Sequence, residues 1–340
     1  MKLLYVVTSS DESIKQILKN KFNMSDRFIL KLKSSNSIYI NDVPVFINYK
    51  IQPNDILTII ENSKEDSSNI IPNSNIKLNV LYEDDFLLIV NKPSNLPVHP
   101  SILHYEDSLS NAVKYHFDEI GLQKKIRPVN RLDKDTSGIV IFAKNEYIQE
   151  CLVKQMQSNI FKKKYLAILS GILNTDSGTI SAPIGRKNDS IIEREIRDDG
   201  DLAISHFKVL ERFNNMTLVE YTLETGRTHQ LRVHSKYIGH PIVGDSLYGS
   251  ESLLISRQAL HAYEVSFIHP ISKEEMIIHC DLPDDIKNLI IKNKNWLFTI
   301  FNNIILKSTS ISSYIEMLFY LSMIKIVLWL KFFNFQILIL

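Results

Sequence analysis

Hydrophobic positions near the N-terminus change from a helical period to short alternating runs. Two clusters spaced at about 3.6 residues predict two short helices. Three apolar runs between Asn, Asp and Pro turns follow and indicate short strands. Residues 1–60 therefore predict a small α+β domain. The positions that carry these patterns are Ile14, Ile17, Leu18 and Phe22, then Phe28, Ile29 and Leu32, then the runs 37–41, 43–47 and 55–59.

Residues 61–77 form a polar, Ser- and Asn-rich segment, which is the composition of a linker. Beyond it, strands outnumber helices and few strand–helix–strand alternations occur, so residues 78–292 predict a mixed, mainly antiparallel sheet with helices packed on it. The fold class that we expect is α+β. We place two strands on either side of a turn at 83–85, leading to Lys92-Pro93. Further strands are expected at 139–143, 164–171, 203–213, 216–223, 260–267 and 275–280, and helices at 146–158 and 228–237.

The C-terminal extension, residues 293–340, is apolar. Residues 317–340 are long enough to cross a bilayer, yet Lys325 and Lys331 lie inside this stretch. A peripheral anchor or partner contact through 296–340, a membrane span and a tail without function all stay open. The short apolar start and the two cysteines favour the cytoplasm.

Charge is balanced over the whole chain but not locally. The 39 Lys and Arg residues against 38 Asp and Glu residues give a net charge of +1, which says nothing about nucleic acid. Between residues 121 and 170, ten basic residues face four acidic ones, a local excess of +6. A solvated surface and a phosphate-binding strip both fit this excess. The basic residues are Lys124, Lys125, Arg127, Arg131, Lys134, Lys144, Lys154, Lys162, Lys163 and Lys164.

The run RPVNRLDKDTSG at 127–138 places five charged side chains directly before an apolar strand. Asp133, Asp135 and Thr136 also fit the nucleophile motif of haloacid-dehalogenase-type phosphatases, but that motif needs an apolar strand before it rather than after it. A calcium loop needs a Glu at its twelfth position, where this chain has Lys144. An ordinary solvated turn is the remaining alternative.

Three further motifs follow in order: KKYLAILSG at 163–171, ETGRTHQLRVHSKYIGHPIVGDSLYG at 224–249 and RQALHAYEVSFIHP at 257–270. Together with 127–138, they resemble the catalytic domain of the RluA/RluD family of RNA pseudouridine synthases. This chain departs from the family pattern at Asn130, where His is usual, and at Ser94-Asn95, where Ala-Gly is usual. Asn tolerates the left-handed backbone that Gly would supply.

The resemblance implies an isomerase that converts uridine to pseudouridine with Asp133 as the catalytic carboxylate. Burial disfavours a charged carboxylate and a nearby guanidinium favours it, and the resemblance assigns that guanidinium to Arg227. Tyr165 is expected to stack on the everted base and to help remove its proton, with Leu260 on the other side of the base. We expect Arg131 to fill the gap in the RNA. The weaker candidates for contacts with the RNA backbone are Lys162, Lys163, Lys164 and Arg232.

The resemblance further implies RNA as partner, large-subunit ribosomal RNA before transfer RNA, and no metal or other cofactor. His229, His234 and His240 lack the spacing of a metal site, and we expect His234 to be a packed, hydrogen-bonded helix residue. Residues 1–60 resemble the S-four-type RNA-binding domain that precedes many such synthases, although another small α+β module is possible. We expect a monomer. The rival function is a non-catalytic RNA-binding protein that keeps this fold.

Overall fold

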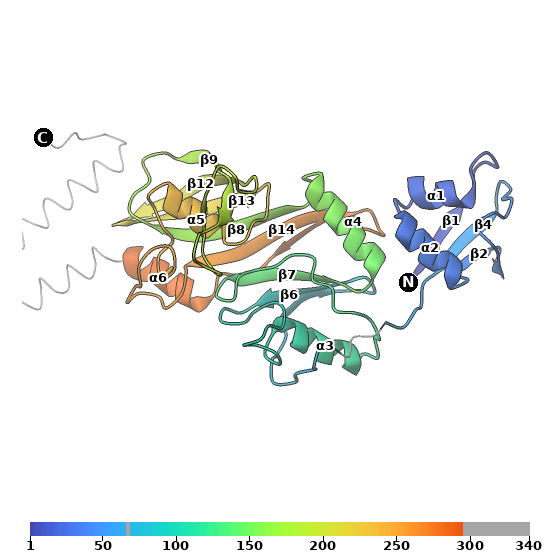
Figure 1. Ribbon diagram of the computed structural model, residues 1–340, viewed down its shortest axis with the longest axis horizontal. Coiled ribbons are helices and arrows are strands. Elements are labelled where there is room, and N and C mark those ends of the chain that lie inside the picture. Colours follow the sequence, from blue (N-terminus) through green and yellow to red (C-terminus); the bar gives the residue numbers. More distant parts are fainter. Residues whose placement is uncertain (66–68, 295–340) are drawn as a thin grey trace, which may run out of the picture. The chain divides into compact units, whose positions relative to one another are not determined.

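A computed structural model of the chain describes residues 1–65 and 69–294 (Figure 1). The chain divides into two compact units, Met1–Pro283 and Asp284–Leu340, and helix α6 (Asp284–Lys294) is the part of the second unit that is described. The predicted contacts through 296–340 lie outside the described residues, and the predicted boundaries at 60, 77 and 292 stay a prediction. Within the described ranges, no helix is long and apolar enough to span a bilayer.

The N-terminal module, residues 1–60, combines two helices with a four-stranded antiparallel sheet of order β1-β4-β2-β3. Both predicted helices form, and Ser13 and Ser25 cap them by accepting backbone N–H bonds. Strand β1 was not predicted, and β3 is short because Pro44 has no N–H to continue the ladder. The elements are β1 (Lys2–Val6), α1 (Ile14–Asn20), α2 (Asp26–Ser34), β2 (Ile38–Ile40), β3 (Val43–Pro44) and β4 (Ile56–Ile60).

A nine-stranded sheet follows, in the order β5-β6-β7-β14-β8-β13-β12-β9, with β15 paired to the far half of β14. Its only parallel pair among the described strands is β7–β14, so the predicted mixed, mainly antiparallel sheet is confirmed. The strands are β5 (Val80–Glu83), β6 (Leu87–Lys92), β7 (Ser137–Ala143), β8 (Lys162–Ser170), β9 (Ser177–Ser181), β12 (Ile204–Phe213), β13 (Met216–Leu223), β14 (Leu260–Ile268) and β15 (Glu275–His279).

The remaining elements were in part foreseen. Helices α4 (Glu146–Gln157) and α5 (Gln230–Tyr237) confirm two predicted helices, whereas α3 (Leu109–Glu119) was not predicted. A small separate ribbon of β10 (Ile184–Arg186) and β11 (Arg194–Ile196) was also missed.

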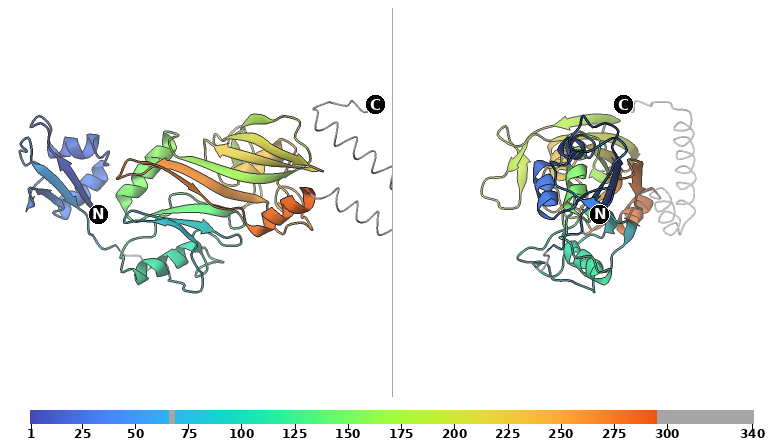
Figure 2. Two further views of the ribbon diagram at one scale, coloured as in Figure 1. Left: turned by 180° about the vertical axis from the view of Figure 1, so that it is seen from behind. Right: turned by 90° about the vertical axis from the view of Figure 1, so that its right-hand side faces the viewer.

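The register of the central strands determines which side chains share a face. Tyr165 on β8 lies opposite Tyr221 on β13 and Ala262 on β14, and residues directly opposite each other point to the same side of a sheet. The Tyr221 hydroxyl bonds to Ser235 Oγ of α5 at 2.8 Å, so α5 covers this side. We call it the front face. Figure 2 shows β8 and β14 running side by side through the middle of the sheet.

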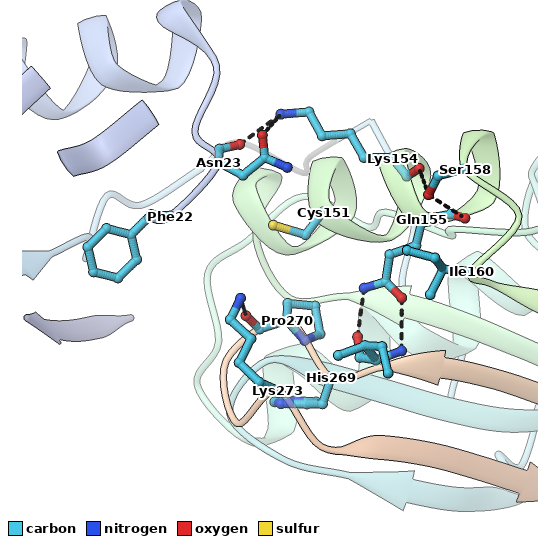
Figure 3. Close-up of a pocket in the computed structure, with 11 residues that line it drawn as sticks. Phe22, Asn23, Cys151, Lys154, Gln155, Ser158, Ile160, His269, Pro270 and Lys273 are labelled. Carbon is cyan, nitrogen blue, oxygen red and sulfur yellow. Dashed lines mark hydrogen bonds between the residues drawn. The ribbon is translucent and has the colours of Figure 1, made fainter. Parts of the chain in front are cut away.

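Helix α4 contacts the N-terminal module. The Tyr147 hydroxyl donates to Phe22 O at 2.8 Å, and the Tyr147 ring stacks on Phe28 with ring centroids 5.6 Å apart. A cavity of about 160 Å³ is lined in part by Phe22 and Cys151. Figure 3 shows the residues that line it, among them Lys154, whose Nζ donates to Asn23 O at 2.7 Å. None of the predicted site residues lines this cavity, so it is not the candidate site.

Candidate active site

Asp133 stands on a loop between a buried anchor and the start of β7. Asn130 is the anchor: its Nδ2 donates to Ile139 O and its Oδ1 accepts from Ile141 N, both at 2.9 Å. Gly138 ends the loop with φ +122°, and a Cβ there would sit 2.2 Å from Ala262 O. Only Gly permits this close approach of β7 to β14, which brings the loop beside the middle of the sheet.

Three buried side chains hold the backbone of this loop. Lys92 Nζ donates to Pro93 O, Leu96 O and Lys134 O at 2.7–2.9 Å. Burial lowers the pKa of Lys92 to about 7, against the opposing charges of Asp135 and Asp133. Three carbonyl acceptors use all three hydrogens of a charged ammonium, which is the form that this geometry requires. On the other side, Arg257 Nη1 donates to Asp135 O, and Gln258 Nε2 donates to Thr136 Oγ1.

The Asp133 carboxylate is held against a guanidinium, but not the predicted one. Arg232 Nη1 lies 3.3 Å from Asp133 Oδ2, and the Asp133 side chain is 27% exposed. Arg232 also makes a two-pronged ion pair with Asp245, at 2.7 and 2.8 Å, and Asp245 is fully buried. Burial alone would lower the pKa of Arg232, but Asp245 and Asp133 together raise it. The guanidinium is therefore a permanent cation between two carboxylates.

The prediction that Arg227 pairs with the catalytic carboxylate is wrong. Arg227 Nε donates to Leu202 O at 3.0 Å, and its Nη1 lies 3.7 Å from Asp201 at an exposed edge. It precedes α5, whereas Arg232 lies in the first turn of that helix and is buried against the loop. The Arg232 guanidinium is already bound to Asp245 and Asp133, so its position does not favour the predicted contact with the RNA backbone.

Tyr165 and Leu260 share the front face beside Asp133. Leu260 lies opposite Ala167 and hence diagonally across from Tyr165, and both side chains are buried. Burial raises the pKa of Tyr165, and the nearby Asp133 carboxylate raises it further. The hydroxyl therefore stays protonated and is a poor acceptor for a proton from the base, which argues against that part of the predicted role.

Lys164 and Arg131 differ in whether they can reach an RNA. Lys164 points away from the front face, and its Nζ lies 2.9 Å from Glu264 Oε1, so the predicted backbone contact does not fit its position. That bond to Glu264 raises the pKa of Lys164. Arg131 is exposed on the catalytic loop, and no ion pair of it exists among the described residues.

His229 is a site residue that the sequence did not reveal. It precedes α5 with a left-handed backbone, φ 57°, and its Nε2 lies 3.9 Å from Asp133 Oδ2. Its Nδ1 lies 2.8 Å from the Tyr248 hydroxyl, whose oxygen accepts Arg194 N–H at 2.8 Å. Burial lowers the pKa of His229, although Asp133 opposes this shift. The sequence pattern placed His229 inside the predicted helix 228–237, so nothing in that pattern distinguished it from the other helix residues.

The other two histidines have structural partners. His234 is buried and bonds to Ser205 Oγ and Ala182 O, at 2.9 and 3.0 Å, which confirms the prediction of a packed helix residue. His240 Nδ1 lies 2.8 Å from Ser170 O.

The two departures from the family pattern have structural explanations. Asn95 adopts φ 58°, the left-handed backbone that was expected where Gly is usual. Asn130 is 7% exposed, and its amide bonds on both sides to β7. Asn130 thus anchors the loop to β7, and its buried amide is not placed to contact a neighbouring nucleotide.

Comparison with known proteins identifies the family of this chain. Residues 86–237 match the RNA pseudouridylate synthase family model. The chain is 38% identical to an uncharacterized RNA pseudouridine synthase, YjbO, of Bacillus subtilis over 271 residues, which is 79% of this chain and 95% of that protein. It is 40% identical over 224 residues to ribosomal large subunit pseudouridine synthase D of Pseudomonas aeruginosa, covering 62% and 70% of the two chains.

A solved structure, human RNA pseudouridylate synthase domain containing 1, superposes with a TM-score of 0.51 at 26% identity, covering 62% of this chain and 86% of that one. The family match ends inside α5, and it contains Asp133, Tyr165 and Arg232. The chain therefore belongs to the RNA pseudouridine synthase family, whose members are isomerases.

Proposed function

We propose that this chain isomerises specific uridines of large-subunit ribosomal RNA, with Asp133 as the catalytic carboxylate. The observation that carries the assignment is a partly exposed carboxylate that lies 3.3 Å from a buried Arg232 and beside the buried Tyr165. The choice of RNA rests on the relatives that are named ribosomal large subunit pseudouridine synthase D.

The reaction breaks the bond between C1′ of the ribose and N1 of the uracil, turns the base, and joins C1′ to C5. C5 loses a proton and N1 gains one, so the product is an isomer of the substrate. Asp133 attacks the sugar or the base, or removes a ribose proton. A paired base cannot reach a carboxylate inside a pocket, so the nucleotide must be everted. Tyr165 and Leu260 would then pack against the uracil, while exposed Arg131 takes its place in the RNA.

Incubation of the full-length protein with large-subunit ribosomal RNA, followed by carbodiimide probing, tests the chemistry. We expect stable adducts at defined uridines with the wild-type protein and none with Asp133→Asn. Equal adducts from both proteins, or none from either, would exclude the enzyme and leave the non-catalytic RNA-binding protein. Pseudouridine mapping in cells that lack the gene, compared with their parent, tests the choice of RNA: a lost site in transfer RNA alone would contradict it.

A further inference from the structure

Ion pairs neutralise half of the basic residues around the catalytic loop. Of the ten basic residues between 121 and 170, five pair with carboxylates at 2.6–3.0 Å. In the ranges that the structure describes, Lys162 and Lys163 are the two half-buried members without such a partner. The five pairs are Lys124–Glu61, Arg127–Glu65, Lys144–Glu83, Lys154–Glu150 and Lys164–Glu264.

Consecutive lysine side chains on strand β8 point to opposite faces of the sheet. Because side chains alternate along a strand, Lys163 shares the front face with Tyr165, two residues on, while Lys162 and Lys164 point to the other side. A Cβ on Gly226 would sit 3.2 Å from Lys163 Nζ. The amine therefore lies against the backbone just before His229 and α5, both of which face the catalytic loop.

The Lys163 ammonium has lost water without gaining a counter-ion. Burial lowers its pKa, and no carboxylate opposes the shift. A partly buried ammonium with no partner is costly, so an arriving anion gains more there than at the exposed Lys134 or Arg131. RNA supplies one such anion with every nucleotide, the phosphodiester.

We propose that Lys163 binds a backbone phosphate of the everted nucleotide or its neighbour. The inference rests on the proposed function, because it assumes that the base packs on Tyr165. With the base there, we expect the ribose and its phosphates to lie along the same face. The Lys163 amine stands on that face beside an unobstructed glycine backbone, and a phosphate oxygen would complete its charge-assisted hydrogen bonds.

Two substitutions in adjacent positions test this proposal. Lys163→Met and Lys164→Met each remove one positive charge from the same strand, so their effect on the net charge is identical. The binding constant of the full-length protein for a fragment of large-subunit ribosomal RNA is measured against KCl concentration. We expect Lys163→Met to weaken binding about tenfold at low salt and to reduce the log–log salt slope by about 0.7–1. Lys164→Met should keep the wild-type slope, and Lys163→Arg should restore it.

Thermal unfolding without RNA separates binding from folding. Removing an uncompensated ammonium should leave the melting temperature of Lys163→Met unchanged or higher, as replacing buried charges by apolar groups often does. Equal salt slopes for the two Met variants, or a lower melting temperature for Lys163→Met with an unchanged slope, would overturn the proposal. If the slopes differ but wild-type protein forms no pseudouridine, the phosphate site stands and the proposed function fails.

Discussion

Arg232 joins two carboxylates that have different tasks. Asp245 is fully buried and holds the guanidinium plane through two hydrogen bonds, and Asp133 receives the remaining Nη1. Arg232→Met should abolish pseudouridine formation and lower the free energy of unfolding by about 3–5 kcal/mol, because it leaves a buried charge unpaired. Single-turnover conversion and urea denaturation measure the two effects.

Arg227→Met is the matched control, since it removes the same charge from an exposed site three residues before α5. The expected change in stability is within about 0.5 kcal/mol, with conversion preserved. Comparable losses of conversion and of stability in Arg232→Met and Arg227→Met would show that Arg232 has no special role in the site.

We expect Tyr248 to hold His229 in one tautomer. Because the Tyr248 oxygen accepts the Arg194 N–H, its own hydrogen is free to go to His229 Nδ1, which leaves the imidazole hydrogen on Nε2 facing Asp133. Tyr248→Phe keeps the ring beneath Arg232 but removes this bond, so we expect mixed tautomers and a conversion rate about three- to tenfold lower. Nitrogen-15 shifts of the histidine ring measure the tautomer directly. An Nδ1-protonated ring in the wild-type protein would contradict the argument.

The prediction of Arg227 in place of Arg232 shows what a sequence motif alone does not determine. The family resemblance placed Asp133, Tyr165 and Leu260 in one site, since each belongs to a separate motif. It could not choose between Arg227 and Arg232, because the choice depends on where α5 begins and on the left-handed backbone at His229. The identity of a residue as His does not by itself predict a left-handed backbone.

At the scale of elements, the catalytic loop depends on a lysine that comes from β6. Lys92→Met removes the donor from three backbone carbonyls, among them that of Lys134, the residue next to Asp133. We expect a loss of about 3 kcal/mol in the free energy of unfolding and faster hydrogen exchange at the Thr136 amide, which donates to Asp133 O. Lys162→Met, on β8, should change neither. Unaltered exchange at Thr136 in Lys92→Met would mean that the loop is held without it.

Strands were predicted best where both faces are buried or strictly alternate. The run 216–223 matches β13 to the residue, and 203–213 matches β12 within one residue. The three-residue strands β10 and β11 were missed because three residues carry too little periodicity. The same alternation would have separated Lys163 from Lys164, once Tyr165 was assigned to the site.

Across the whole molecule, acidic residues of the segment 61–77 do more than connect two modules. Glu61 is buried and pairs with Lys124 at 2.8 Å and with Lys31 at 3.4 Å. Glu65 receives two hydrogen bonds from Arg127, at 2.6 and 2.9 Å. Composition alone had indicated a solvated linker. Glu61 and Glu65, at the start of this segment, are instead ion-paired to α2 and to the residues that lead into the catalytic loop. These partners are distant in the sequence and come together only in the fold.

Glu65 makes the stability of this arrangement depend on pH. Burial would raise its pKa, but the bonds from Arg127, Lys125 and Lys31 lower it from 4.5 to about 2. A carboxylate with a lowered folded-state pKa stabilises above its unfolded pKa, so this contribution is complete above about pH 5 and disappears towards pH 2. Glu65→Gln should therefore cost up to about 3 kcal/mol at pH 7 and almost nothing near pH 2. Urea denaturation across this range measures the difference. Asp42→Asn, at an exposed acid of the N-terminal module, should follow the wild-type curve throughout. A constant difference between Glu65→Gln and wild type from pH 7 to pH 2 would show that the carboxylate is not held by these cations.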